Sequence, residues 1–168
     1  MMQVTKITDM RRKSFADMPC PIARSLDIVG EWWTLLIIRD ALAGASRFED
    51  FRKSGIADNI LSTRLDFLVH EGVLERRAYQ AHPPRSEYVL TDKGHELLPV
   101  VAALGMWGLR WTKGGGEPPR FLHRRCGSEV EATFRCPTCS EAVHPSEIQV
   151  LRPQAAAERR LATFEPGV

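Results

Sequence analysis

The sequence lacks any apolar run approaching the ~20 residues that cross a bilayer, and its first residues contain no apolar signal-peptide core. We therefore expect a cytoplasmic protein without a membrane partner. The sequence also lacks an excess of either positive or negative charge. The net charge is +2 over 168 residues, and residues 44–91 carry seven Lys/Arg and seven Asp/Glu. Bulk electrostatics thus neither supports nor excludes a nucleic-acid partner.

Catalytic motifs are missing as well. The chain contains no paired carboxylates, nucleophile elbow or phosphate-cradling glycine loop, so we expect no enzyme. Cysteine is scarce, with four residues in all. A hydrophobic content of 43% and a charged content of 26% are typical of globular proteins. The length suffices for one domain with a real core and a small appendage.

What the sequence does contain is an amphipathic helix after Gly55. Leu61, Leu65 and Leu68 recur at i, i+4 and i+7 and so share one inward face. The outward face and its flank carry Asn59, Ser62, Thr63, Asp66 and His70. Gly72 is a plausible C′ residue that ends the helix.

Elements on both sides of this helix complete a pattern. Helices are expected at 22–29, at 32–43 (largely buried) and at 46–54, the last with Ser46 as N-cap and Glu49 closing a capping box. Strand-like runs 73–79 and 86–90 form a hairpin with a cationic tip. The predicted fold is mostly α with a small β-hairpin wing (α+β), a winged helix-turn-helix. A plain core helix followed by a solvated hairpin remains the alternative.

In a winged helix-turn-helix, this arrangement assigns roles in DNA binding. Asn59, Ser62 and Thr63 are expected to read bases in the major groove. Phosphate contacts are expected from Arg47, Arg52, Lys53 and Arg85. Arg64 lies on the helix flank, where it can reach either a phosphate or an internal carboxylate.

Short motifs in a fixed order now support a family resemblance. They are Cys20-Pro21-Ile22-Ala23, Gly30, Trp33–Ile37, Arg47-Phe48, Leu61-Ser62-x-Arg64-Leu65, Gly72–Leu74, Arg77, Pro83–Arg85, Glu87-Tyr88-x-Leu90-Thr91 and Gly94. Over residues 18–112 the chain resembles the HxlR family of bacterial transcriptional regulators, which implies a dimeric winged-helix protein that binds double-stranded DNA. Two residues depart from the family pattern: Glu31, where relatives often have a small or basic residue, and Ala57, which replaces the usual hydroxyl N-cap.

The resemblance also gives a role to the last long helix, expected over 92–113 with a bend at Pro99. Its apolar surface, including Leu104, Trp107 and Trp111, exceeds what one domain requires. By analogy with the family, this surface forms a homodimer interface across a twofold axis. Packing within one chain is the alternative.

Cys20 is a candidate redox sensor. Two prolines place its thiol at the start of a helix, and Arg24 lies four residues on, a setting that favours the thiolate. Some members of the resembled family sense oxidants through a cysteine at the matching position. A small-molecule or oxidant effector is therefore expected, with a plain buried cysteine as the alternative.

The sequence changes character after residue 113. Residues 114–120 are a Gly/Pro-rich linker, and residues 121–150 are expected to form a zinc-ribbon-like β extension with residues 128–135 as one strand. The expected ligands of a structural Zn²⁺ are His123, Cys126, Cys136 and Cys139, with His144 as an alternative fourth ligand. A metal-free hairpin or a Cys136–Cys139 disulfide remains possible, and the tail 151–168 is either a short helix or disordered.

These observations predict a homodimeric regulator, a repressor, that binds palindromic operators through residues 1–113. Two alternatives come from other classes of protein. One is a thiol- or zinc-dependent redox protein, and the other is an adaptor whose extension docks a protein partner.

Overall fold

The computed structural model describes residues 14–82, 85–114, 116–117, 120–130 and 133–151. Most of the predicted tail, residues 152–168, lies outside this range. The chain forms two compact units, Met1–Pro119 and Arg120–Val168, called here the N-terminal and C-terminal units.

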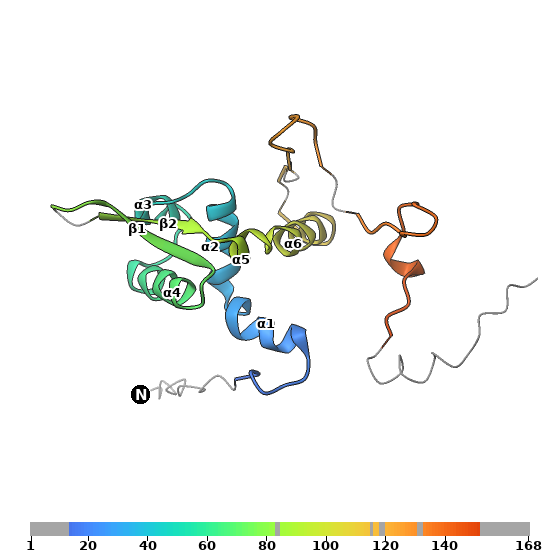
Figure 1. Cartoon of the computed structure of the whole chain (residues 1–168), viewed down its shortest axis with the longest axis horizontal. Helices are drawn as coiled ribbons and strands as arrows, with labels where there is room; N and C mark the ends of the chain where they lie inside the picture. Colours follow the sequence, from blue (N-terminus) through green and yellow to red (C-terminus); the bar gives the residue numbers. More distant parts are fainter. Residues whose placement is uncertain (1–13, 83–84, 115, 118–119, 131–132, 152–168) are drawn as a thin grey trace, which may run out of the picture. The chain divides into compact units, whose positions relative to one another are not determined.

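The N-terminal unit is mostly helical and contains one antiparallel hairpin, which confirms the predicted fold class (Figure 1). Its elements are α1 (Pro21–Val29), α2 (Trp32–Leu42), α3 (Phe48–Arg52), α4 (Asp58–His70), β1 (Leu74–Gln80), β2 (Arg85–Leu90), α5 (Asp92–His95) and α6 (Leu98–Trp111). None of the helices in the described ranges is long and apolar enough to cross a membrane.

The core lies between α2, α3, α4 and the base of the hairpin. Leu61, Leu65 and Leu68 of α4 are fully buried, as their spacing predicts. They meet Ile37, Ile38, Phe51, Ile56, Val73, Leu74 and Tyr88. Phe51 packs edge-to-face on Tyr88 with ring centroids 6.4 Å apart, and so joins α3 to the hairpin.

The end of α4 sets the direction of the hairpin. Gly72 has φ +69° and is the predicted C′ glycine, and the N–H of Val73 donates to the carbonyl of Leu68 at 2.9 Å. Beyond the hairpin, Gly94 allows α5 to pack closely, because a Cβ there would lie 2.4 Å from the Val73 carbonyl oxygen. The chain therefore folds back onto the base of the hairpin.

The hairpin pairs Leu74 with Leu90 and Arg76 with Tyr88, and its register shifts between Ala78 and Gln80. This shift is a bulge near the tip. The residues just before α3 lie beside β2, because the N–H of Tyr88 donates to the carbonyl of Ser46 at 2.7 Å. Figure 1 shows the hairpin projecting away from the helices, with α6 at the other end of this unit.

The structure corrects three local predictions. The final helix is broken into α5 and α6, and Pro99 lies in the first turn of α6 instead of bending a continuous helix. The N-cap of α3 is Arg47, and Asp50 accepts from its backbone N–H, so the Ser46–Glu49 capping box is wrong by one residue. The helix α2 is not buried all round, because Trp32 is 88% exposed in the single chain.

The C-terminal unit is built differently. Among its described residues there are two isolated β-bridges, Leu122–Glu129 and Arg135–Ala142, and a 3₁₀ turn, η1 (Pro145–Glu147). The expected single strand 128–135 is not formed, because the described residues at its two ends pair within separate turns. None of the described residues of this unit is buried.

Candidate nucleic-acid interface

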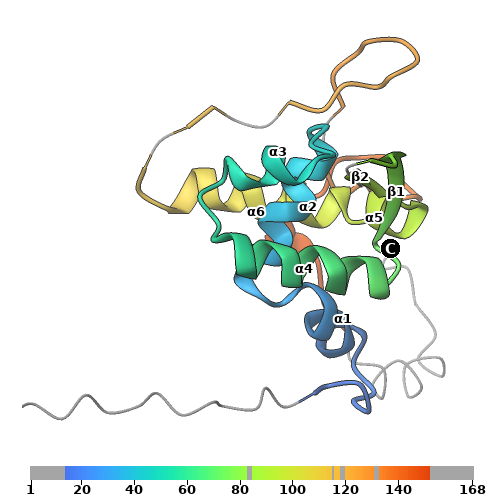
Figure 2. The same cartoon turned by 90° about the vertical axis from the view of Figure 1, so that its left-hand side faces the viewer.

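The outward face of α4 carries the three residues predicted to read bases. Asn59, Ser62 and Thr63 are all exposed, and Figure 2 shows α4 lying across the face turned toward the viewer, beside α3. The hydroxyl of Thr63 donates to the Asn59 carbonyl at 2.8 Å, which fixes the Thr63 side chain against its own helix. Asn59 and Ser62 keep their side-chain donors and acceptors free of bonds to described residues.

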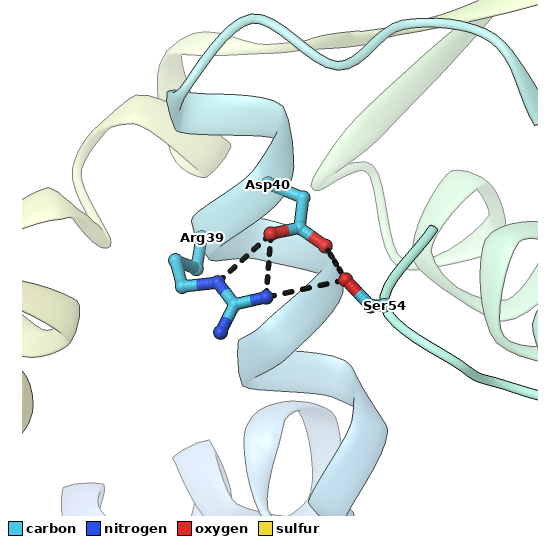
Figure 3. A network of polar contacts seen from close by, with 3 residues as sticks. All are labelled: Arg39, Asp40 and Ser54. Carbon is cyan, nitrogen blue, oxygen red and sulfur yellow. Dashed lines mark hydrogen bonds and ion pairs between the residues drawn. The ribbon is translucent and has the colours of Figure 1, made fainter. Parts of the chain in front are cut away.

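A polar network holds the turn that precedes α4. Arg39, near the end of α2, pairs with Asp40 at 2.7 Å and donates to the Ser54 hydroxyl at 3.2 Å (Figure 3). The Ser54 hydroxyl in turn donates to the Asp40 carboxylate. Gly55 follows with φ +82° and makes the turn into α4. The network therefore fixes the position of α4 relative to α2, and sequence reasoning missed it.

Two of the predicted phosphate-binding cations are paired with carboxylates. Arg52 lies 3.0 Å from Asp58, and Lys53 lies 3.0 Å from Asp50. The hydrogen bond from Lys53, together with those from the backbone of Arg47 and Ser46, lowers the pKa of Asp50 below its ordinary value. Arg52, Asp58 and Lys53 are exposed, and ion pairs that are open to solvent are weak.

The other two phosphate candidates belong to the wing side of the unit. The Arg47 guanidinium stacks 4.9 Å from the centre of the Tyr79 ring, and its backbone forms a bridge with Glu87. Arg85 begins β2 and is exposed, with no ion pair to a described residue. Of the four candidates, Arg85 is thus the one whose charge is not already neutralised by a described neighbour or stacked on a ring.

Arg64 pairs with an internal carboxylate, that of Glu31, which is one of its two predicted partners. Its Nε lies 3.6 Å from the Glu31 carboxylate, an ion pair that is longer than a hydrogen bond, and about three-quarters of each side chain is covered. The same carboxylate accepts from the backbone N–H of Trp33 at 3.0 Å and caps α2. Glu31 therefore ties the start of α2 to the middle of α4.

A second link joins α4 to the hairpin. Arg76 of β1 lies 3.5 Å from Asp66 of α4 and stacks 5.6 Å from the centre of the Tyr88 ring. Burial raises the pKa of the Tyr88 hydroxyl above its ordinary value. Sequence reasoning gave Arg76 no role, although Asp66 on the outward face of α4 offered it a partner.

Cys20 and the proposed dimer residues are exposed in the single chain. Cys20 is the N-cap of α1 with a free thiol, and Arg24 donates to the Met18 carbonyl at 2.8 Å. The alternative of a buried Cys20 is thus not seen in this chain. On α6, Leu104 is 51%, Trp107 58% and Trp111 70% exposed, so packing within one chain does not cover them.

An open groove lies beside α1, the segment that precedes it and the end of α4. Arg24, Asp27, Phe67 and Glu71 contribute to its lining. Asp27 accepts from the Ser14 hydroxyl at 2.9 Å, and so anchors the segment that borders the groove. A ligand in this groove would touch α4, the helix that carries the residues predicted to read bases.

In the C-terminal unit the predicted metal ligands form two separate pairs. His123 Nδ1 lies 3.0 Å from Cys126 Sγ, and the thiol of Cys139 forms a hydrogen bond with that of Cys136. Hydrogen bonds from Ser128 lower the pKa of Cys126, and the backbone N–H groups of Cys139 and Thr138 lower that of Cys136. Within the described ranges, no three His, Cys, Asp or Glu side chains converge on one metal position.

Comparisons with known proteins give consistent matches. A family model described as HxlR-like helix-turn-helix matches residues 28–115. The uncharacterised HTH-type transcriptional regulator Rv3095 of Mycobacterium tuberculosis is 37% identical over 124 residues, which cover 73% of this chain and 78% of that protein. The crystal structure of PA1607, a candidate transcription factor, aligns with a TM-score of 0.68 at 36% identity and covers 83% of this chain and 99% of that one. The redox regulator HypR in its oxidised form aligns with a TM-score of 0.53 at 31% identity, covering 56% of this chain and all of that one.

Proposed function

The chain belongs to the HxlR-like helix-turn-helix family of transcriptional regulators, and on that premise we propose that it is a homodimeric repressor that binds palindromic operators. The observation that carries this proposal is the exposed polar face at the start of α4, held in place by the Arg39–Asp40–Ser54 network (Figure 3). The matched proteins are named as transcription regulators, which argues against an enzyme.

Bases are read by Asn59 and Ser62, with Thr63 in support. Asn59 in the first turn of a helix can bond to the N6 and N7 edge of adenine in the major groove. Thr63 already donates to the backbone, so its hydroxyl oxygen acts as an acceptor and its methyl group offers an apolar contact. This division of roles makes Asn59 the residue with the largest effect on sequence preference.

Affinity for the DNA backbone comes mainly from Arg85 on the wing, supported by Arg47, Arg52 and Lys53. Arg85 has no competing ion pair to a described residue, whereas Arg52 and Lys53 must exchange a carboxylate for a phosphate. Arg64 is better described as a positioning residue, since its charge faces Glu31. It holds α4 at a fixed angle to α2.

The exposed apolar residues of α6 support the homodimer. A single chain that leaves Trp107 and Trp111 more than half exposed presents the kind of surface that a second copy covers. Trp32 at the start of α2 adds to the same argument, because it is exposed as well. A twofold dimer presents two α4 helices, and its operator is then a palindrome.

Cys20 is the proposed oxidant sensor of this regulator. Its thiol is exposed at the start of α1, and the matched HypR is named as a redox regulator. Ile22 and Leu26 of α1 are also exposed, so a modification of Cys20 would act on a surface suited to a partner chain. The test compares operator binding before and after mild oxidant in the wild type and in Cys20→Ser. Equal behaviour of the two proteins would remove Cys20 from this role.

The function is tested by retarded migration of a duplex taken from upstream of the protein's own gene, followed by selection of genomic fragments. We expect a complex of two chains per duplex that resists an excess of unrelated DNA. A redox protein or a protein adaptor would show no sequence preference. Repression is checked by transcription in vitro from a promoter that carries the selected site, where added protein should lower transcript yield.

A further inference from the structure

The C-terminal unit contains two copies of the same ten-residue turn. Residues 121–130 and 134–143 align without a gap at an offset of thirteen positions. Each copy has phenylalanine first and valine last, and a histidine or a cysteine at its third and sixth positions. Those side chains are His123 and Cys126 in the first copy and Cys136 and Cys139 in the second.

The two copies share their backbone hydrogen bonds as well. The N–H of Val130 donates to the Phe121 carbonyl at 2.7 Å, and that of Val143 to the Phe134 carbonyl at 2.9 Å. Inside each turn the third residue donates to the eighth, from His123 to Ser128 at 2.8 Å and from Cys136 to Glu141 at 3.0 Å. The two β-bridges also lie at equivalent positions. The two segments therefore share a backbone structure as well as a sequence pattern.

Each turn closes in the same unusual conformation. The residue after the second metal-binding side chain has positive φ, +73° at Gly127 and +59° at Ser140. Ser140 is the sole non-glycine residue with positive φ within the described ranges. Positive φ is energetically unfavourable for a non-glycine L-residue, so the rest of the turn must hold Ser140 in this conformation.

The turn brings its two donor atoms together. His123 Nδ1 and Cys126 Sγ are 3.0 Å apart, and the thiols of Cys139 and Cys136 share a hydrogen bond. Such pairs, two positions apart around a tight turn, present two ligands to one metal ion. All four cysteines of the chain are free thiols in the structure.

The unit has little else to stabilise it. Phe121, Cys136 and Val143 are half-buried, and every other described residue of the unit is exposed. Small domains with so little apolar burial usually depend on disulfides or a metal. The preformed turns therefore lack the element that would join them.

We propose that the two turns bind one structural Zn²⁺ through His123 and the thiolates of Cys126, Cys136 and Cys139. Four nitrogen and sulfur ligands make a closed tetrahedral site with no position left for a substrate. The three thiols lose their protons to solvent on binding. Because the two pairs do not yet converge, the ion closes one turn against the other and so completes the fold of the unit.

The structure also decides between the two candidate histidines. His144 Nδ1 lies 2.7 Å from the Ser146 hydroxyl and accepts from the Ser146 backbone N–H, and thus caps η1. His123 instead faces a thiol in its own turn. The site is therefore assigned to His123, and His144 is left to its capping role.

The test measures metal in the full-length protein. Elemental analysis of protein purified without chelator should give about one Zn²⁺ per chain. Replacement by Co²⁺ should produce the thiolate charge-transfer and tetrahedral d–d absorption of a site with three sulfur ligands. Cys126→Ser and Cys139→Ser should each lower Zn²⁺ affinity by at least about tenfold. Cys20→Ser and His144→Ala are the matched controls and should leave the Co²⁺ spectrum unchanged.

A gain-of-ligand variant keeps the test informative if the serine variants fail to fold. His123→Cys should retain the metal and shift the Co²⁺ spectrum toward that of four thiolates. The proposal is overturned if the protein takes up neither metal, or if Cys126→Ser leaves the Co²⁺ spectrum intact. A Cys136–Cys139 disulfide found by mass spectrometry of the freshly purified protein would overturn it as well.

Discussion

The two units of this chain are stabilised in opposite ways. The N-terminal unit buries leucines of α4 against α2, α3 and the hairpin, and its polar contacts then fix the position of each element. The described part of the C-terminal unit buries no residue and relies on backbone hydrogen bonds in two turns. The contrast is the reason for proposing that the second unit depends on a bound metal, whereas the first depends on its core.

Metal removal should give the largest effect and should separate the units. A structural Zn²⁺ contributes on the order of 10 kcal/mol of binding free energy, and in a unit without a core this is folding free energy. Chelation should therefore abolish amide protection in the two turns and leave that of α4 unchanged, as measured by hydrogen exchange. Loss of protection in α4 as well would show that the two units depend on each other.

A cavity in the core should have the next largest effect. Leu65→Ala removes a fully buried side chain and should destabilise the N-terminal unit by about 2–5 kcal/mol. All four tryptophans lie in this unit, so urea unfolding followed by tryptophan fluorescence at fixed protein concentration reports on it alone.

The matched control for that cavity comes from the other unit. Leu122 is 57% exposed, and Leu122→Ala should change the same transition by less than about 0.5 kcal/mol. Equal shifts for the two variants would contradict the assignment of a core to only one unit.

Loss of a base contact should reduce sequence specificity and leave the fold unchanged. Asn59→Ala should reduce discrimination between the selected operator and unrelated DNA by about 1–3 kcal/mol. His70→Ala, at the other end of α4 and also exposed, is the control and should leave this discrimination unchanged. If Asn59→Ala weakens all duplexes equally, Asn59 acts on the backbone and not on a base.

Loss of the wing cation should show in the salt dependence. Arg85→Ala should weaken specific and unrelated duplexes alike and flatten the slope of log K against log salt by about one unit. Lys113→Ala is the control, because it removes an exposed cation at the end of the same unit. An unchanged slope in Arg85→Ala would place the wing away from the phosphates.

The smallest effect is expected from the cap of α3. The pKa of Asp50 is lowered in the fold, so its contribution to stability is present above its unfolded value of 3.8 and is lost as the pH falls through the lower folded value. Asp50→Asn should therefore reduce the free energy of unfolding at neutral pH and flatten its decline in acid. A parallel decline in both proteins would assign the acid sensitivity to another carboxylate.

The fold could be predicted where apolar residues with helical spacing all pack against one surface of the core. The spacing of Leu61, Leu65 and Leu68 identified the buried face of α4, and Gly72 its end. The sequence could not show which residue is the N-cap of α3, because Ser46–Glu49 and Arg47–Asp50 have the same spacing. The break before Leu98 was missed because the surrounding sequence continues the helical pattern.

The site was harder to predict than the fold, because it depends on contacts between distant residues. Arg64 had two possible partners on the helix flank, and Glu31, far away in the sequence, decides between them. The Arg39–Asp40–Ser54 network likewise joins two elements whose contact no local pattern reveals (Figure 3). The roles assigned to the DNA-binding residues stay predictions.

The most direct test of the central claim is hydrogen exchange of the full-length protein with and without its selected operator duplex. The claim is that the N-terminal unit meets DNA through α4 and the wing. Binding should then slow exchange in the first turns of α4 and around Arg85. Binding of the duplex with no added protection in α4 would contradict the account.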